Sequence, residues 1–107
     1  MARISTHVLD IAKGAPAAGI TVELQAGGHL IGSACTNADG RTDAPLLTAE
    51  RISAGAYELV FHVRDYLRGD PPFFDRITIR FAVSDEGGNY HVPLLLAPHG
   101  YSTYRGS

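Results

Sequence analysis

The stretch Ala56-Tyr-Glu-Leu-Val-Phe-His-Val63 carries a strong β-strand signal. Its large apolar side chains, Tyr57, Leu59, Phe61 and Val63, stand at every second position. Because successive side chains of a strand point to opposite faces, these four share one face and their polar neighbours take the other. The pattern predicts a strand that buries one of its two faces.

The same kind of signal recurs on both sides of that stretch. Segments of strand length with alternating or mainly apolar residues are Arg3–Asp10, Ile20–Ala26, His29–Thr36, Ala56–Val63, Arg76–Val83 and Tyr90–Ala97. In the first of them, Ile4, Thr6 and Val8 share one face, while Ser5 and His7 share the other. We predict a strand for each segment, and the first one carries a histidine on its second face.

Turns rich in glycine, proline, asparagine and aspartate separate these segments. They are Gly14–Gly19, Gly27-Gly28, Asn37–Gly40 and Ser84–Asn89. Pro45–Ala54 fits a short strand or a loop equally well, and Arg64–Gly69 fits one helical turn that Pro71 and Pro72 end. Short strands at such spacing predict an all-β protein, a two-sheet antiparallel β-sandwich with one short helix, as a single domain over residues 1–107.

The composition narrows the classes of partner. The 107 residues are 45% hydrophobic and 19% charged, with a formal net charge of −2. This charge argues against a nucleic-acid partner, which needs a basic surface. Met1 is followed by no apolar signal segment, and no apolar run reaches membrane-spanning length, so we expect no membrane partner and a cytoplasmic location. Cys35 is the single cysteine and permits no intrachain disulfide.

Five histidines are present, and each taken alone is most often a packing or surface residue. His62 lies opposite the apolar face of its strand, which favours a surface position or a subunit contact. His29 and His99 adjoin glycine-containing turns, and we expect both to be solvated. His7 and His91 differ from these, since each stands early in a predicted strand among polar neighbours.

Several kinds of chemistry remain open from the residues alone. Three histidines can hold a catalytic zinc, but no His-x-His or His-Glu-x-x-His spacing supports that site. Two histidines and an arginine can instead perform acid–base chemistry, because imidazole titrates near neutral pH and guanidinium stabilises anionic charge. No Gly-x-Ser-x-Gly elbow or phosphate-binding glycine loop is present, and Cys35 has an apolar strand context without an activating partner.

The C-terminal stretch Tyr90–Ser107 begins as a predicted strand and ends in the polar tetrapeptide Tyr104-Arg-Gly-Ser107. Termini of small domains usually fray. Two tyrosines and an arginine in this short tail favour a segment that is held against the protein and used.

This tail and other motifs resemble the transthyretin-like family and, within it, the 5-hydroxyisourate hydrolases. The matching motifs are Ser5–Asp10, Thr36–Thr42, Gly55–Val63, Pro72–Asp75, Tyr90–Leu96 and Tyr101–Ser107. They stand in the family's order and cover nearly the whole chain. The closing tetrapeptide is the most specific of them, because it separates the hydrolases from transthyretin itself.

The resemblance implies a transthyretin-like (prealbumin-like) sandwich and an enzyme that hydrolyses 5-hydroxyisourate in urate degradation, with no metal and no cofactor. The residues that the family pattern makes catalytic are His7, Arg41 and His91. Those that it makes substrate-binding are His7, Arg41, Tyr104, Arg105, Gly106 and Ser107.

The resemblance also implies a homotetramer, a dimer of dimers with its sites at the dimer–dimer interface. An alternative is a non-catalytic transthyretin-like carrier, for which we expect a less polar channel and a C-terminus without the tetrapeptide. A monomeric β-sandwich adhesion module and a zinc hydrolase are further alternatives. The sequence does not assign the base and acid roles to the two histidines.

Overall fold

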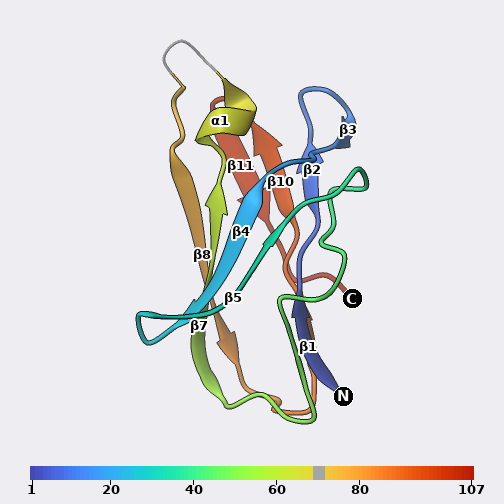
Figure 1. The fold of residues 1–107 in the computed structure, drawn as a ribbon, viewed down its shortest axis with the longest axis vertical. Coiled ribbons are helices and arrows are strands. Elements are labelled where there is room, and N and C mark those ends of the chain that lie inside the picture. Colours follow the sequence, from blue (N-terminus) through green and yellow to red (C-terminus); the bar gives the residue numbers. More distant parts are fainter. Residues whose placement is uncertain (69–71) are drawn as a thin grey trace.

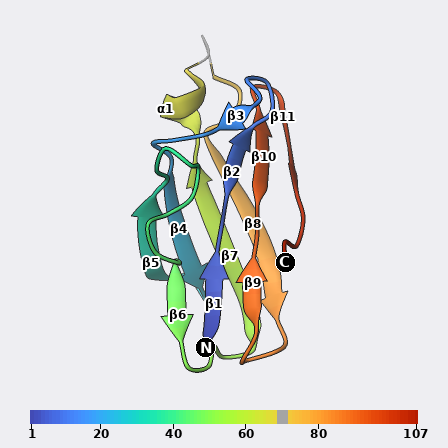
Figure 2. The same ribbon diagram turned by 90° about the vertical axis from the view of Figure 1, so that its right-hand side faces the viewer.

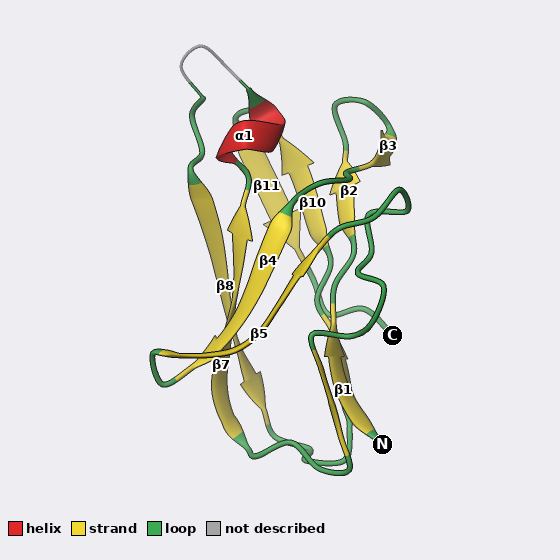
Figure 3. Cartoon of the chain, viewed as in Figure 1, coloured by secondary structure: helices red, strands yellow, loops and turns green. Residues whose placement is uncertain are grey.

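A computed structural model describes residues 1–68 and 72–107 of the chain. Two layers of β-sheet pack face to face in a body of 42 × 26 × 20 Å (Figure 1). One short helix, α1 (Arg64–Leu67), lies at one end of the layers (Figure 3). The predicted all-β sandwich with one short helix is confirmed. The strands are β1 (Ala2–Ser5), β2 (Val8–Asp10), β3 (Ala15–Pro16), β4 (Thr21–Ala26), β5 (His29–Cys35), β6 (Leu47–Ala49), β7 (Gly55–His62), β8 (Arg76–Val83), β9 (Asn89–His91), β10 (Leu94–Ala97) and β11 (Gly100–Thr103).

The first layer has the strand order β5-β4-β7-β8, with antiparallel neighbours throughout. Gly27 and Gly28 join β4 to β5 with φ angles of 57° and 79°, the positive values that glycine adopts without a steric cost. The turn predicted at this dipeptide is confirmed, and it joins an antiparallel hairpin. Strand β7, which carries the alternation first noted in the sequence, lies inside this layer between β4 and β8.

The second layer consists of two sheets placed end to end, β6-β1-β9 and β11-β10-β2-β3. Strand β2 continues the line of β1, and β10 continues the line of β9 (Figure 2). Ser5 pairs with His91 and Val8 pairs with Leu94, both in parallel orientation. The two pairs have the same sequence offset, so the register continues across the gap. These two parallel pairs correct the prediction that the sandwich is antiparallel throughout.

The break between the two sheets corrects two predicted strands. The segments Arg3–Asp10 and Tyr90–Ala97 were each predicted as one strand, and each is divided in two. Pro93 lies at the break and has no N–H to donate to the neighbouring strand. The hydroxyl of Thr6 donates to the carbonyl oxygen of Val92 at 2.7 Å, which gives that oxygen a side-chain donor.

Smaller differences concern segment ends and turns. Strand β5 ends at Cys35 rather than Thr36, because the buried Thr36 turns inward and its hydroxyl donates to the carbonyl oxygen of Ala17 at 2.8 Å. The undecided stretch Pro45–Ala54 contains β6, and the predicted turn Gly14–Gly19 contains β3.

At the C-terminal side, β11 was not predicted, because its sequence Gly-Tyr-Ser-Thr lacks an apolar alternation. The predicted helical turn is present as α1, while Gly69 and Pro71 of that prediction lie outside the described residues.

The core lies between the two layers, and the predicted apolar faces supply it. Its largest fully buried side chains are Phe61, Ile4, Ile20, Leu24, Leu59, Leu94, Leu96, Val8, Val22, Val63, Thr6 and Pro93. On β8, which corresponds to the predicted strand Arg76–Val83, Ile77 and Val83 are buried, while Ile79 and Phe81 are partly buried against the core. In the described part of the chain, no helix has the length and apolar character to cross a membrane.

Candidate functional site

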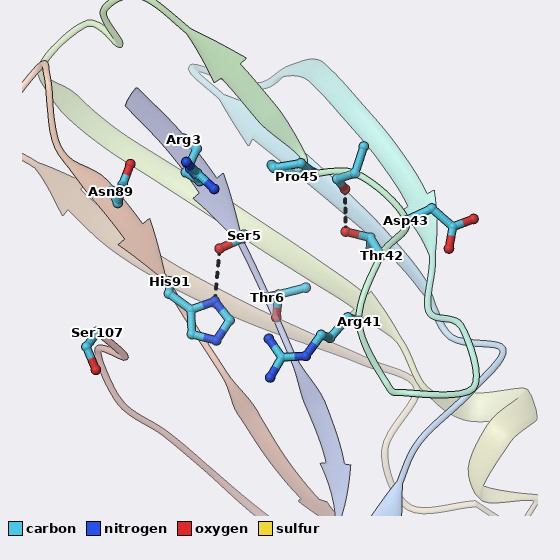
Figure 4. Close-up of a pocket in the computed structure, with 11 residues that line it drawn as sticks. Arg3, Ser5, Thr6, Arg41, Thr42, Asp43, Pro45, Asn89, His91 and Ser107 are labelled. Atoms are coloured by element: carbon cyan, nitrogen blue, oxygen red, sulfur yellow. Dashed lines mark hydrogen bonds between the residues drawn. The ribbon is translucent and has the colours of Figure 1, made fainter. Parts of the chain in front are cut away.

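A cavity of about 320 Å³ opens beside the break in the second layer (Figure 4). We call it the site cavity. Strands β1 and β9, the loop that follows the Asn37–Gly40 turn, and the end of the tail form its wall. The lining residues are Arg3, Ser5, Thr6, Arg41, Thr42, Asp43, Ala44, Pro45, Asn89, His91 and Ser107.

His91 is the last residue of β9 and is half-buried in the cavity wall. Its Nδ1 lies 2.9 Å from the hydroxyl oxygen of Ser5, its register partner on β1. Burial lowers the pKa of His91 below its ordinary value of 6.5, and the charges of Arg41 and His7 lower it further. The imidazole is therefore neutral near pH 7 and suited to proton transfer.

Arg41 is set beside the cavity by a compact turn. The side-chain oxygen of Asn37 accepts hydrogen bonds from the amide nitrogens of Asp39 at 2.9 Å and Arg41 at 3.3 Å. Gly40 supplies a φ of 75°, and its carbonyl oxygen accepts a hydrogen bond from the amide of Val8. The predicted turn thus attaches to β2 through Gly40 and places Arg41 next to it, with its side chain toward His91 (Figure 4).

His7 lies in the gap between β1 and β2, and not early in a strand as predicted. Its backbone forms an isolated antiparallel bridge with Arg41. Its Nε2 lies 2.8 Å from the carbonyl oxygen of Asp39. A carbonyl oxygen can only accept, so Nε2 of His7 carries a proton and Nδ1 is the nitrogen left for other partners. The structure brings His7 next to Arg41, although it does not place His7 in the described wall of the cavity.

The end of the tail is tied to His91. The amide of Gly106 donates to the carbonyl oxygen of His91 at 2.8 Å, in an isolated antiparallel bridge. Ser107 follows directly and lines the site cavity on the other side of the imidazole from Arg41 (Figure 4). The prediction that the tail is held against the protein is confirmed for these two residues.

Tyr104 and Arg105 face a different cavity, of about 250 Å³, between β8, β9 and the tail. The guanidinium of Arg105 stacks over the ring of Tyr90 at 4.5 Å and donates to the carbonyl oxygen of Asn89 at 3.3 Å. Tyr104 is 55% exposed. Within one chain, the tetrapeptide therefore contributes to two cavities. Ser107 lines the site cavity with His91, while Tyr104 and Arg105 line the second cavity with Tyr90.

The remaining candidates lie elsewhere. Nε2 of His62 is 2.7 Å from a carboxylate oxygen of Glu23 on the first layer, and His29 and His99 are exposed. Cys35 is an exposed free thiol. Across residues 1–68 and 72–107, no three His, Cys, Asp or Glu side chains gather closely enough to hold a metal ion.

The model of the HIUase/Transthyretin family matches residues 4–106 of the sequence. The chain belongs to this family. The matched range includes both predicted histidines, Arg41 and the tail as far as Gly106.

Individual members of the HIUase/Transthyretin family agree with this assignment. The chain is 52% identical to the 5-hydroxyisourate hydrolase of Deinococcus radiodurans, over 97% of this chain and 95% of that protein. The solved structure of the Klebsiella pneumoniae 5-hydroxyisourate hydrolase superposes with a TM-score of 0.88 at 39% identity, over all of both chains. Sea bream transthyretin in complex with thyroxine superposes with a TM-score of 0.84 at 28% identity, over 97% of this chain and 94% of that one. The transthyretin-like fold is thus confirmed.

Some residues of the cavity wall were not predicted, among them Arg3, Ser5 and Asn89. Ser5 had a usable signal, since the alternation places it on the same strand face as His7. Arg3 had the same signal, because it stands two residues before Ser5 in the predicted strand. Asn89 had none, because it falls in the predicted Ser84–Asn89 turn and reaches the cavity as the register partner of Arg3 in the parallel β1–β9 pair.

Proposed function

We propose that this chain hydrolyses 5-hydroxyisourate to 2-oxo-4-hydroxy-4-carboxy-5-ureidoimidazoline, as a step of urate degradation. The observation that carries the proposal is the meeting of His91 and Arg41 at one cavity, with His7 bridged to Arg41. It is supported by the name of the 52% identical relative, a 5-hydroxyisourate hydrolase.

The reaction opens a cyclic amide. The oxygen of a water molecule forms a bond to the ring carbonyl carbon, the C–N bond of the six-membered ring breaks, and the ring nitrogen takes up a proton. His7 and His91 share the base and acid duties, for which a neutral imidazole near pH 7 is suited. Arg41 binds the electron-rich substrate and stabilises the oxyanion that develops at the carbonyl.

The tail residues complete the proposed substrate site. Ser107 supports this assignment because it lines the site cavity, and Gly106 does so because it packs on His91. Tyr104 and Arg105 line the neighbouring cavity, so we assign their contribution to the assembled oligomer, in which a partner subunit would close the site.

The assembly we propose is a homotetramer, a dimer of dimers with the sites at the dimer–dimer interface. In the described part of the chain, β8 and β11 each pair with a single neighbour and so present an open sheet edge. Light scattering coupled to gel filtration tests this. A monomer at the concentration used for activity would contradict it.

The activity itself is tested by producing 5-hydroxyisourate with urate oxidase and following its ultraviolet absorbance. We expect the wild-type chain to accelerate the decay, and His91→Ala and His7→Ala each to reduce kcat by about 100- to 10,000-fold. His29→Ala is the matched control, since His29 is exposed on β5 in the other layer, and it keeps wild-type turnover.

The second candidate function is a carrier, favoured by the superposition with a transthyretin that holds thyroxine. The same assay separates the two functions, because a carrier leaves the spontaneous decay of 5-hydroxyisourate unchanged. Near-wild-type turnover in both histidine variants would instead show that the hydrolase is real and the catalytic assignment wrong.

A further inference from the structure

The hydroxyl oxygen of Ser5 lies 2.9 Å from Nδ1 of the His91 imidazole, within hydrogen-bond distance. The backbone fixes this contact from both sides. Ser5 and His91 are register partners of the parallel β1–β9 pair, and the amide of Val92 donates to the carbonyl oxygen of Ser5 at 2.9 Å. The two side chains therefore meet because neighbouring strands hold them, and not through a mobile loop.

The other nitrogen of the ring faces a cation. In Figure 4 the Nε2 side of His91 is turned toward the guanidinium of Arg41. A guanidinium carries N–H donors and no acceptor, so a proton on the facing nitrogen meets only repulsion. The lowered pKa of His91, to which burial contributes first and the charge of Arg41 second, agrees with this arrangement. A lone pair on Nε2 is thus the favourable choice.

We propose that Ser5 is a positioning residue that accepts a hydrogen bond from Nδ1–H of His91, so that Nε2 stays unprotonated and directed into the site cavity. The inference rests on the proposed hydrolase function, within which it gives His91 the role of base. A proton of the attacking water then passes to Nε2, while the bond from Nδ1–H to Ser5 stays in place and steadies the imidazolium.

Ser5 can accept this hydrogen bond because its own O–H group can donate to a different partner. The residue is half-buried and lines the cavity, so its O–H can point to water or to substrate while its oxygen receives Nδ1–H. His7 is held in the opposite way, through Nε2 on the carbonyl oxygen of Asp39. The two histidines therefore present different ring nitrogens, which provides the asymmetry that the sequence could not supply.

The tautomer is measured directly by ¹⁵N NMR of the imidazole nitrogens in the assembled protein without substrate. We expect the wild-type signal of the unprotonated nitrogen to belong to Nε2 of His91, and Ser5→Ala to yield a mixture of tautomers. Ser5→Thr keeps the hydroxyl and restores the wild-type pattern. An Nε2–H tautomer in the wild type, or an unchanged tautomer in Ser5→Ala, overturns the proposal.

The kinetic arm uses the same variants. Ser5→Ala lowers kcat/KM by about tenfold, the effect of losing one neutral hydrogen bond, and moves the acid limb of the pH profile. Ser5→Thr stays near the wild type, as does the control Ser33→Ala, an exposed serine on β5 of the other layer. Full activity in Ser5→Ala with an unmoved pH profile contradicts the role. If the wild type is inactive, the hydrolase function fails, while the NMR arm still decides the tautomer.

Discussion

Gly106 lies so close to the imidazole of His91 that a side chain at position 106 would collide with the ring. A Cβ there would be 2.5 Å from Cδ2 and 3.2 Å from Cγ of His91. The same glycine donates its amide to the carbonyl oxygen of His91 at 2.8 Å. Backbone pairing and ring packing together make the tail a support for one side of the imidazole, while Ser5 holds the other.

Gly106→Ala is therefore expected to displace the ring of His91 or to detach the tail. A misplacement of about 1 Å in a catalytic group costs roughly 100-fold in rate, and we expect kcat/KM to fall by about that factor. Gly100→Ala is the matched control, because a Cβ at Gly100 meets no atom within 4 Å. Equal activity of the two alanine variants in the ultraviolet assay would show that the ring packing is unimportant.

The titration of His91 should respond to Arg41. Burial is the first cause of its lowered pKa, and the charge of Arg41 is the second. A cation beside an imidazole disfavours the protonated form, so Arg41→Gln removes part of the effect and the pKa of His91 rises toward 6.5. NMR titration of the ring measures the shift directly.

Activity that needs neutral His91 will then be lost at a higher pH in Arg41→Gln than in the wild type, in addition to a lower maximal rate. Arg64→Gln on α1 is the control, because that exposed side chain lies at the far end of the molecule. A pKa of His91 that is the same in all three proteins would contradict the proposed electrostatic coupling.

Thr6 forms a hydrogen bond across the break in the second layer, and we expect its hydroxyl to stabilise the fold. It is 2% exposed and donates to the carbonyl oxygen of Val92 at 2.7 Å. Thr6→Val keeps the shape but removes the donor, which costs about 1–3 kcal/mol of unfolding free energy for a buried acceptor left without it. Urea denaturation measures the loss. Thr48→Val, at an exposed position of β6, should change stability by less than about 0.5 kcal/mol.

The break also shows what a single sequence can and cannot predict. The layers follow from alternation, since the apolar face around Leu59 is buried as expected. The division at Pro93 was missed because the surrounding apolar run reads as one strand, although a proline cannot donate within a ladder. The parallel pairing of β1 with β9 depends on contacts between distant segments, which local patterns do not encode.

The residues of the candidate site that stand in sequence motifs were predictable. Those that reach the cavity only through strand pairing were not. His7, Arg41 and His91 were named from motifs. The structure places Arg41 and His91 in the wall of one cavity and joins the backbone of His7 to that of Arg41. Ser5 was not named, although the alternation places it on the face of His7, because its contact with His91 depends on the pairing of β1 with β9. Strand β11 was missed for a related reason, as its pairing with β10 is made by a polar sequence.

A buried carboxylate provides a separate stability test. Asp10 accepts a hydrogen bond from the hydroxyl of Tyr66 at 2.7 Å and from the amides of Ala12 and Lys13 at 3.1 and 3.0 Å. Burial by itself would raise the pKa of Asp10, but these hydrogen bonds and the charge of Lys13 lower it overall. Burial and Asp10 raise the pKa of Tyr66 to about 12, so the phenol stays a donor at all working pH values.

Tyr66→Phe removes a donor to an ionised acceptor and should destabilise the fold by about 1.5–3 kcal/mol at pH 7. Because the pKa of folded Asp10 is lowered, its contribution is present above the ordinary value of 3.8 and is lost as the pH falls through the folded value. The difference between wild type and Tyr66→Phe should therefore shrink in acid. Denaturation midpoints at pH 7 and near pH 3 measure both, and an equal difference at the two values would contradict the role of Asp10.

Deletion of Tyr104–Ser107 should impair catalysis far more than folding. The deletion removes the amide that binds the carbonyl oxygen of His91 and the wall that Ser107 gives the site cavity. The core residues lie in the strands before it, and Thr103 retains its hydrogen bond to the carbonyl oxygen of Pro93 at 2.7 Å. We expect a loss of about 100-fold or more in kcat/KM, by the same reasoning on misplaced groups, with a well-defined unfolding transition.

Arg105→Ala distinguishes the contributions of the two halves of the tail, because it removes the stacking on Tyr90 and leaves the Gly106 bridge intact. A truncated protein with full activity would mean that the tail only covers the imidazole and does not hold it.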